Sequence, residues 1–306
     1  MIVTGLDAVD TAPRVVALGS FDGVHLGHRR VIGRAVEAAA QRGARAAVVT
    51  FDPHPMQVLR PELAPRELST PQRRAGLIAE LEPDELIVIR FTHEFSLLDH
   101  ERFAEEVLRD RLNAVLVIVG RNFRYGHRAQ GTIETLAASG ARLGFEAEPS
   151  PLVEVDGVPV SSSRIRDLLS AGEVSHAERL LGRHPWLDGV IVRGDGRGRE
   201  LGFATANLEC SSHTAFPATG IYAGRAHVAG ITRPAAISVG YNPTFTDDRE
   251  HLRVEAHLLD FDGDLYGQPM HLEFSRRLRG EERYGSVDEL VEQVHRDIAA
   301  VRSNAP

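Results

Sequence analysis

The sequence predicts an α/β domain built on a doubly wound parallel sheet, followed by an antiparallel β-barrel domain that ends in a helix. Two observations support this fold class. Within the first 150 residues, short runs rich in β-branched residues alternate with segments of helical apolar spacing, which is typical of a parallel sheet covered on both faces. Beyond residue 184, short apolar runs between Gly, Pro and Asp turns replace this alternation and favour an antiparallel sheet or small barrel.

Four buried strands and three helices are expected in the first domain. The strands are 14–19, 44–51, 85–91 and 113–120, and the helices are 28–42, 71–81 and 99–111. Ligands of such a sheet bind at the carboxyl ends of the strands, so the loops after these strands are candidate sites. A hairpin with an Asp156-Gly157 turn is expected over 153–160, and serines 161–163 are candidate N-caps of a helix running to about Leu169.

The second domain is expected to contain the strand runs DGVIVRG, IYAGRAHV, PAAISVGY, RVEAHLLDF and QPMHLEF. Its last helix opens with Ser286 and Glu289 in capping-box spacing and is apolar on one side, so we expect it to pack against the barrel. The change of pattern predicts two domains, 1–183 and 184–306.

Length and composition restrict the function classes. The 306 residues suffice for two domains, and the net charge of −8 argues against nucleic-acid binding, because binders of the phosphate backbone carry a basic surplus. No apolar stretch approaches the ~20 residues of a membrane helix, and the N-terminus lacks a secretory signal. We therefore expect a cytoplasmic protein without a membrane partner, and the single Cys210, interpreted as a small buried apolar residue, agrees with a reducing compartment. The sequence sets no oligomeric state.

The chain contains no lysine, so all 35 basic residues are arginine. This excludes Schiff-base chemistry, the GK[ST] phosphate loop and the β3 lysine of protein kinases. Any nucleotide phosphates must therefore be held by groups other than an ammonium.

The motif GSFDGVHLGH follows the first expected strand. Gly19 and Gly23 allow a ligand to approach closely, and a helix beginning near Leu26 would point free N–H groups at an anion. His25 and His28 lie three residues apart, so on one helical turn they share a face and can donate hydrogen bonds to phosphate oxygens. A helix start with one capping and one surface histidine is the alternative, and these residues alone leave both interpretations open.

Three further motifs lie where a doubly wound sheet places its ligands: FDPHP, GRNFRYG and SSSRIR. Ser162 or Ser163, the amides of the helix start and Arg166 would form a second phosphate clamp facing the first. Taken alone, the serines are better interpreted as simple caps and Arg166 as a solvated residue. His54, between two prolines, is assigned no chemistry.

Together these four motifs resemble HxGH-type nucleotidyltransferases, and specifically the adenylyltransferase half of bacterial bifunctional riboflavin kinase/FAD synthetases. The resemblance implies a Rossmann-like domain that transfers AMP from ATP to FMN and releases pyrophosphate. It also implies roles for site residues. His25 and His28 would contact the ATP phosphates, Ser162, Ser163 and Arg166 would bind the leaving phosphates, Asn122 would place nucleotide or flavin, and Gly19, Phe21, Asp22 and Gly23 would complete the nucleotide site. Mg²⁺ would arrive mainly on the nucleotide, since no HExxH-type ligand spacing occurs.

The second half of the chain resembles the kinase domain of the same family through GRELGFATAN, GIYAG, GYNPTF and VEAHLLDFDGDLYG. The resemblance implies that Thr205 and Asn207 help to hold Mg²⁺ and the ATP phosphates, and that Gly198 and Arg199 contact the nucleotide. Glu255 would lie beside the ribityl 5′-hydroxyl of riboflavin as the base. From the residues alone, Glu255 is better interpreted as an outward-facing carboxylate of a half-exposed sheet.

One position departs from the family pattern, because Ala204 stands where the family has proline. Proline would fix φ, so we expect a looser segment, by about 0.4–1 kcal/mol, and weaker binding of Mg·ATP. The expected function is therefore phosphorylation of riboflavin to FMN followed by adenylylation of FMN to FAD. The alternatives are an FMN adenylyltransferase with a weakened or inactive kinase domain, and a flavin-binding protein without either activity.

DFDGDLYG has the appearance of a calcium loop, but it lacks Gly at the sixth position and an acid at the twelfth. We therefore interpret Asp262-Gly263 as a hairpin turn.

Overall fold

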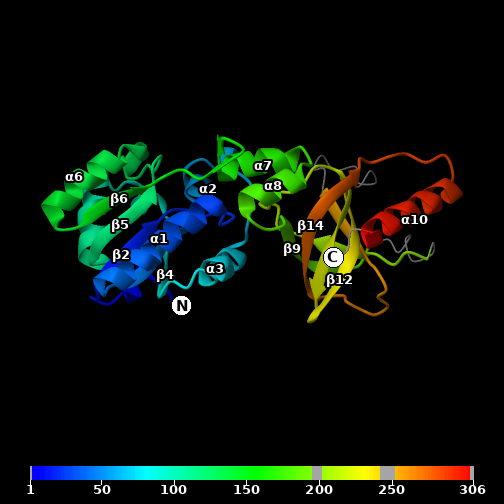
Figure 1. Cartoon of the computed structure of the whole chain (residues 1–306), viewed down its shortest axis with the longest axis horizontal. Coiled ribbons are helices and arrows are strands. Elements are labelled where there is room, and N and C mark those ends of the chain that lie inside the picture. The colour runs from blue at the N-terminus through cyan, green and yellow to red at the C-terminus, as the bar shows by residue number, and fades with distance from the viewer. Residues whose placement is uncertain (1, 195–201, 242–251, 304–306) are drawn as a thin grey trace. The chain divides into compact units, whose positions relative to one another are not determined.

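A computed structural model of the protein describes residues 2–194, 202–241 and 252–303. The chain forms two compact units, Met1–Ser162 and Ser163–Pro306, and each is described by itself (Figure 1). The first contains a parallel sheet with helices and the second a closed antiparallel barrel, so the predicted fold class is confirmed.

The sheet of the first unit has six parallel strands in the order β1-β4-β3-β2-β5-β6. The strands are β1 (Ile2–Gly5), β2 (Arg14–Leu18), β3 (Arg45–Asp52), β4 (Glu85–Arg90), β5 (Ala114–Gly120) and β6 (Glu146–Ser150). From β2 the chain moves through β3 and β4 and then returns to the other side of β2 at β5. The topological switch point, where doubly wound sheets bind ligands, therefore lies between β2 and β5.

Helices cover both faces of this sheet. The three predicted helical segments correspond to α1 (Leu26–Arg42), α3 (Pro71–Ala79), and α5 (His100–Arg102) continued by the π-helix η3 (Phe103–Arg111). The unpredicted ones are η1 (Leu6–Ala8), α2 (Pro55–Leu59), η2 (Pro61–Leu63), α4 (His93–Ser96), η4 (His127–Ala129) and α6 (Ile133–Leu143). Among the described residues, no helix has the length and apolar character needed to span a membrane.

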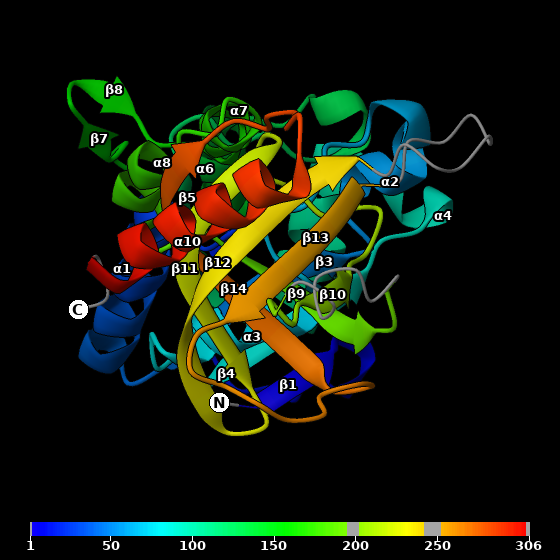
Figure 2. The same ribbon diagram turned by 90° about the vertical axis from the view of Figure 1, so that its right-hand side faces the viewer.

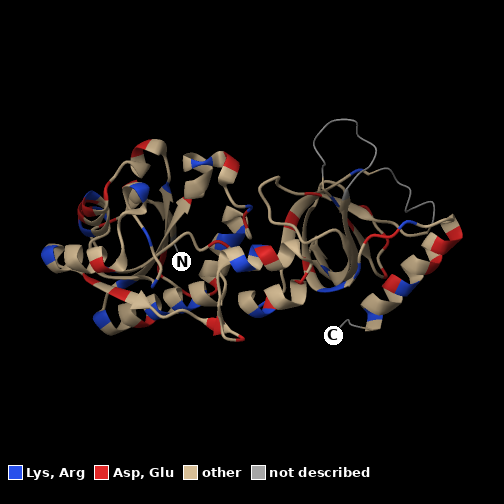
Figure 3. Cartoon of the chain, turned by 90° about the horizontal axis from the view of Figure 1, so that it is seen from above, with Lys and Arg blue, Asp and Glu red and all other residues tan. Residues whose placement is uncertain are grey.

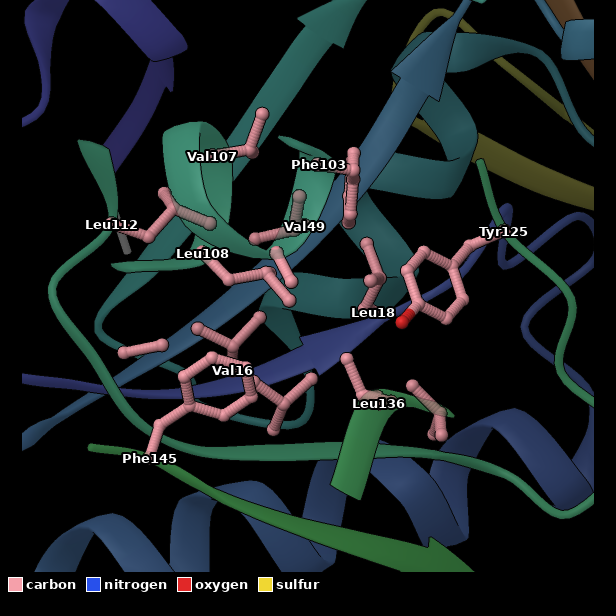
Figure 4. Close-up of a cluster of buried hydrophobic side chains, with 14 of the residues drawn as sticks. Val16, Leu18, Val49, Phe103, Val107, Leu108, Leu112, Tyr125, Leu136 and Phe145 are labelled. Carbon is pink, nitrogen blue, oxygen red and sulfur yellow. The ribbon is translucent and has the colours of Figure 1, made fainter. Parts of the chain in front are cut away.

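The core of the first unit follows from the alternation of strand side chains. Val16 and Leu18 of β2 belong to one cluster with Phe103, Leu108 and Leu136 of the helices η3 and α6 (Figure 4). Because successive strand side chains point to opposite faces, the intervening residues of β2 face the other side, where α1 packs against β2 and β3. All five residues of β2 are therefore buried.

A buried ion network lies at the opposite, amino-terminal ends of the strands. Arg14 is 1% exposed and its Nε lies 2.6 Å from Glu85 Oε2, while Arg45 Nη1 lies 2.6 Å from Glu85 Oε1. Burial by itself raises the pKa of Glu85, but the hydrogen bonds from Arg14 and Arg45 outweigh it and hold this pKa below its ordinary value.

The predicted hairpin is present as β7 (Glu154–Val155) and β8 (Val158–Pro159), with Asp156 and Gly157 at φ of 54° and 71°. The helices α7 (Ser162–Ser170) and α8 (Val174–Leu181) follow. The second unit includes both, because Ala218 N donates to Leu169 O at 2.9 Å and Ser175 Oγ donates to Ser275 O at 3.1 Å. The compact units thus divide at the first residue of α7, whereas the sequence pattern changes after α8.

The barrel is closed in the order β10-β13-β12-β11-β14-β9. Its strands are β9 (Trp186–Val192), β10 (Ala206–Glu209), β11 (Gly220–Val228), β12 (Ile231–Tyr241), β13 (Leu252–Leu258) and β14 (Pro269–Arg279). The helix α10 (Val287–Ser303) packs across β11 and β12, as predicted (Figure 2).

The cap of α10 is as predicted at Ser286, whose Oγ accepts the N–H of Glu289 at 3.2 Å. The Glu289 carboxylate, however, accepts the N–H of Gly285 at 2.9 Å, one residue before the position that a capping box uses. The first half of the helix carries only acidic charges, and both of its arginines lie in the second half (Figure 3), where Asp297 is paired with Arg279 at 2.7 Å.

The prediction of a hairpin turn at Asp262-Gly263 was wrong. The strands on either side, β13 and β14, are not neighbours in the barrel, since β13 pairs with β10 and β12 and β14 with β11 and β9. The intervening segment 259–268 is a connection between non-adjacent strands, so no two-residue turn can join them. Part of it lines a cavity instead.

Candidate active sites

A cavity of about 390 Å³ lies in the first unit at the carboxyl ends of β2 and β5. Its lining comes from the end of β2, the start of α1, the end of β5, and residues 150–153 and 160–162. Six of the predicted site residues lie in it: Gly19, Phe21, His25, His28, Asn122 and Ser162. The topology therefore gathers motifs more than a hundred residues apart in the sequence at the switch point.

His25 and His28 form one side of this cavity. His25 is the N-cap of α1, and its Nδ1 accepts the N–H of His28 at 3.3 Å. Their rings are stacked with centroids 3.6 Å apart and planes 19° apart, and the Phe21 ring meets His28 edge-on at 5.3 Å. A Cβ at Gly27 would lie 3.1 Å from the His25 ring, so glycine permits this position. The capping interpretation holds for His25, and both rings also line the cavity.

The loop before α1 has an unusual backbone that its neighbours hold in place. Phe21, Gly23 and Val24 have positive φ angles of 49°, 79° and 37°. Gly23 N donates to Ser69 Oγ at 3.1 Å, and a Cβ at Gly23 would lie 2.9 Å from the Leu68 side chain. Gly23 is thus required by both its conformation and the close approach of Leu68.

The Asp22 carboxylate points toward residues 68–69 and does not line the cavity. It is 2% exposed and accepts the N–H groups of Leu68 at 2.9 Å and Ser69 at 3.2 Å. Its backbone carbonyl accepts the hydroxyl of Ser162 at 3.0 Å. Asp22 therefore joins the loop to residues 68–69 and to Ser162, and its predicted contact with phosphate stays a prediction.

Ser69 and Arg74 were missed by the sequence reasoning. Arg74 is buried, and its guanidinium donates to Ser20 O at 3.2 Å and to Phe51 O at 3.3 Å. Ser20 follows the end of β2, and Phe51 is the last residue but one of β3. The sequence does indicate a buried Arg74, because this residue shares the buried face of α3 with Leu77 and Ile78 at helical spacing. An arginine on an apolar face indicates a buried acceptor.

Two other predicted residues of the first site belong to the second compact unit. Ser163 and Arg166 are on α7 beyond the division between the two units, and their role as a phosphate clamp stays a prediction. His54 is the N-cap of α2, where its Nδ1 accepts the N–H of Met56 at 3.2 Å.

A second cavity, of about 450 Å³, lies in the barrel. It is lined by β10, β13 and the connection 261–266, and includes the predicted Thr205, Asn207 and Glu255. Asn207 and Glu255 are directly opposite each other in the pairing of β10 with β13. The predicted Gly198 and Arg199 fall outside the described residues.

The Glu255 carboxylate is held at both oxygens. Thr205 Oγ1 donates to its Oε2 at 3.0 Å, and Arg253 Nε lies 2.7 Å from its Oε1. Arg253 Nε also donates to Asn207 Oδ1 at 2.9 Å. Sequence reasoning did not identify Arg253, although its position two residues before Glu255 places both side chains on one face of β13.

Two small residues shape the metal-binding segment predicted over 203–207. A Cβ at Gly194 would collide with the side-chain amide of Asn207, so a larger residue at this position would displace that amide. The carbonyl of Ala204 is hydrogen-bonded to Nδ1 of His257 at 2.9 Å, and Phe203 meets the ring of His295 edge-on at 5.1 Å. These contacts anchor the backbone on both sides of the peptide that joins Phe203 to Ala204, the residue that replaces the expected proline.

The donor atoms of the second cavity suit a hard cation that obtains most of its ligands from water and phosphate oxygens. Thr205 and Asn207 offer a hydroxyl and an amide oxygen, the kind of ligand that Mg²⁺ accepts beside waters and phosphates. Over residues 2–194, 202–241 and 252–303 there is no group of three His, Cys, Asp or Glu residues that could hold a metal. The hydroxyl and amide donors are of the kind that suits Mg²⁺ bound to a nucleotide.

Comparisons with known proteins cover nearly the whole chain. Residues 8–164 match the family model described as FAD synthetase, and residues 181–305 match the one described as riboflavin kinase. Curated bifunctional riboflavin kinase/FMN adenylyltransferases are similar: that of Bacillus subtilis is 36% identical (94% of this chain, 91% of the relative), that of Pseudomonas fluorescens 35% (95% and 93%), and that of Escherichia coli K12 32% (98% and 96%).

A crystal structure described as that of a macrolide-efflux protein from Streptococcus pneumoniae is also similar. It is 30% identical, has a TM-score of 0.89 and covers the whole of both chains. The likeness extends over both units of the fold.

Proposed function

Because the chain belongs to the bifunctional riboflavin kinase/FMN adenylyltransferase family, we propose that each of the two cavities carries one of its activities. The protein phosphorylates riboflavin to FMN with ATP and adenylylates FMN to FAD with release of pyrophosphate. The observation that carries this conclusion is the presence of both domains in one chain. It favours the bifunctional interpretation over an adenylyltransferase with an inactive kinase domain.

We propose that the first cavity binds ATP and FMN for adenylyl transfer. An oxygen of the FMN phosphate attacks the α-phosphorus of ATP while the bond from that phosphorus to pyrophosphate breaks. His25 and His28 would donate hydrogen bonds to the phosphate oxygens as charge builds, together with the amides at the start of α1. We assign Nε2 of His25 to this contact, because its Nδ1 serves the helix cap. Asn122, at the end of β5, would place the nucleotide or the flavin.

We propose that the barrel cavity carries the kinase reaction. Glu255 would accept a hydrogen bond from the ribityl 5′-hydroxyl and orient it, and in a loose transition state this orientation matters more than strong basicity. Thr205 and Asn207 would hold Mg²⁺ on the ATP phosphates. The bound cation would neutralise the charge of the transferred phosphoryl group. Support comes from the grouping of all three side chains around one cavity.

We propose 1–183 as the segment required for adenylylation and 184–306 as the segment required for phosphorylation. The two family models end and begin at residues 164 and 181, and most of α7 and of α8 lies between those limits. We also propose a cytoplasmic location, where ATP and reducing conditions are available; fractionation of cells producing the protein tests it.

The assay that tests the function supplies riboflavin, ATP and Mg²⁺ and resolves the flavin products by chromatography. Wild type is expected to form FMN and FAD. Glu255→Gln should block FMN formation yet convert supplied FMN to FAD, whereas His28→Gln should accumulate FMN from riboflavin. If either variant lost both activities while remaining folded, the assignment of one activity to each cavity would be wrong.

A further inference from the structure

Arg253 places a positive charge between the residues proposed to hold the metal and to orient the nucleophile. Its Nε lies 2.9 Å from Asn207 Oδ1 and 2.7 Å from Glu255 Oε1. Both residues line the barrel cavity, and Asn207 Oδ1 is the atom that would ligate a cation.

A single N–H cannot make two well-aligned hydrogen bonds, so the contact owes much to the charge of the guanidinium. The amide dipole and the carboxylate together make this point of the cavity favourable for a cation. A divalent ion bound to the same amide oxygen would lie within a few ångströms of the guanidinium and be repelled by it. The two cations therefore exclude each other from Asn207.

We propose that Arg253 is a built-in competitor of the divalent cation in the kinase site. This inference rests on the proposed assignment of Asn207 to the metal. The guanidinium occupies the amide oxygen until Mg·ATP binds and displaces it, and it thereby raises the metal concentration that the kinase site requires. The contact of Arg253 with Glu255 can persist after Asn207 is released. Arg253 and Glu255 lie on the same strand, β13, whereas Asn207 lies on β10.

The charge of Arg253 can be removed by substitution without unfolding the barrel. The Arg253 side chain is 29% exposed and lies at the cavity, while the interior of the barrel is filled by apolar side chains such as Ile237, Val254 and Leu272. A methionine at position 253 would keep much of the length of the side chain and lose its charge.

The test measures binding of Mn²⁺ to the full chain with ADP, from the paramagnetic resonance signal of unbound Mn²⁺. Arg253→Met is expected to bind Mn²⁺ about three- to tenfold more tightly than wild type, the effect of removing a like charge from a partly exposed site. Arg253→Lys, which keeps the charge, should remain close to wild type. Arg233→Met serves as the control, since Arg233 is an exposed residue of β12 that does not line the cavity.

Asn207→Ala shows how much of the bound Mn²⁺ is held in the barrel cavity, because it removes the proposed ligand there. If Asn207→Ala weakens binding but Arg253→Met leaves it unchanged or weakens it too, the competitor role is overturned and the metal assignment stands. Binding unaffected by Asn207→Ala would overturn the metal assignment, and the inference with it. Tighter binding in Arg253→Met alone, with Arg233→Met at the wild-type value, supports the proposal.

Discussion

The imidazole rings of His25 and His28 are stacked 3.6 Å apart, while Nδ1 of His25 accepts the backbone N–H of His28 at 3.3 Å. His25 thus caps α1 and at the same time forms a wall of the first cavity. The two roles depend on different atoms, so substitutions can separate them.

His25→Asn and His25→Ala should both lower FMN adenylylation by about a hundredfold, the typical effect of removing one donor to developing charge. Only His25→Ala should also lose about 1 kcal/mol of unfolding free energy, because asparagine can still cap the helix. Steady-state rates and urea denaturation measure the two effects. Wild-type activity in His25→Asn would exclude the ring from the reaction.

Gly27→Ala should impair adenylylation because its Cβ would lie 3.1 Å from the His25 ring and displace it. Gly33→Ala on the same helix is the matched control, since nothing lies within 4 Å of its Cβ. This control should gain about 0.5–1 kcal/mol of stability from helix propensity and keep full activity. Equal activities of the two variants would contradict the proposed dependence on the His25 position.

Gly194→Ala should abolish riboflavin phosphorylation, because the added Cβ would collide with the Asn207 amide. Adenylylation of supplied FMN should be unchanged. Gly280→Ala in the same unit, where the nearest atom, in the Arg277 side chain, is 3.9 Å away, should leave both rates at the wild-type value. Retained kinase activity in Gly194→Ala would show that the Asn207 position is not critical.

Ala204→Pro should tighten Mg·ATP binding in the kinase reaction and stabilise the barrel by about 0.4–1 kcal/mol through the unfolded chain. His257→Ala, which removes the contact with the Ala204 carbonyl, should act in the opposite direction. The apparent KM for ATP in riboflavin phosphorylation and the thermal midpoint report both effects. A proline variant with unchanged KM and kcat counts against a loosened segment.

Acid should destabilise the first unit through Glu85, whose pKa is held low by the hydrogen bonds from Arg14 and Arg45 against the effect of burial. Stabilisation by a carboxylate with a lowered pKa is complete above its unfolded pKa of about 4.3 and is lost as the pH falls through the folded pKa. Glu85→Gln should cost about 1–3 kcal/mol at pH 7, with a smaller loss toward pH 3, because it removes the buried carboxylate that pairs with Arg14 and leaves that guanidinium only its ion pair with Asp10. Chemical denaturation between these pH values measures it, and the exposed Glu80→Gln, expected to match wild type, is the control.

Several features of the fold could be predicted because they depend on local sequence. The apolar runs of β2 to β5 are long and bounded by turns, and the Asp156-Gly157 pair favours positive φ at both positions. The edge strands β1 and β6 were missed, because IVTG and EAEPS lack the alternation of a half-buried strand or the apolar run of a buried one. Their pairing with β4 and β5 supplies what their sequences lack.

The sequence by itself determined the fold class, the order of the two domains and the residue types that can handle phosphate without lysine, because these follow from periodicity and composition. Only the tertiary structure decided which neighbours those residues have. It turned Asp22 toward residues 68–69, placed Arg74 under the ends of β2 and β3, and put Arg253 against Asn207. Such contacts join segments about 46 residues or more apart, so strand order and register create them, and neither is encoded in any single segment.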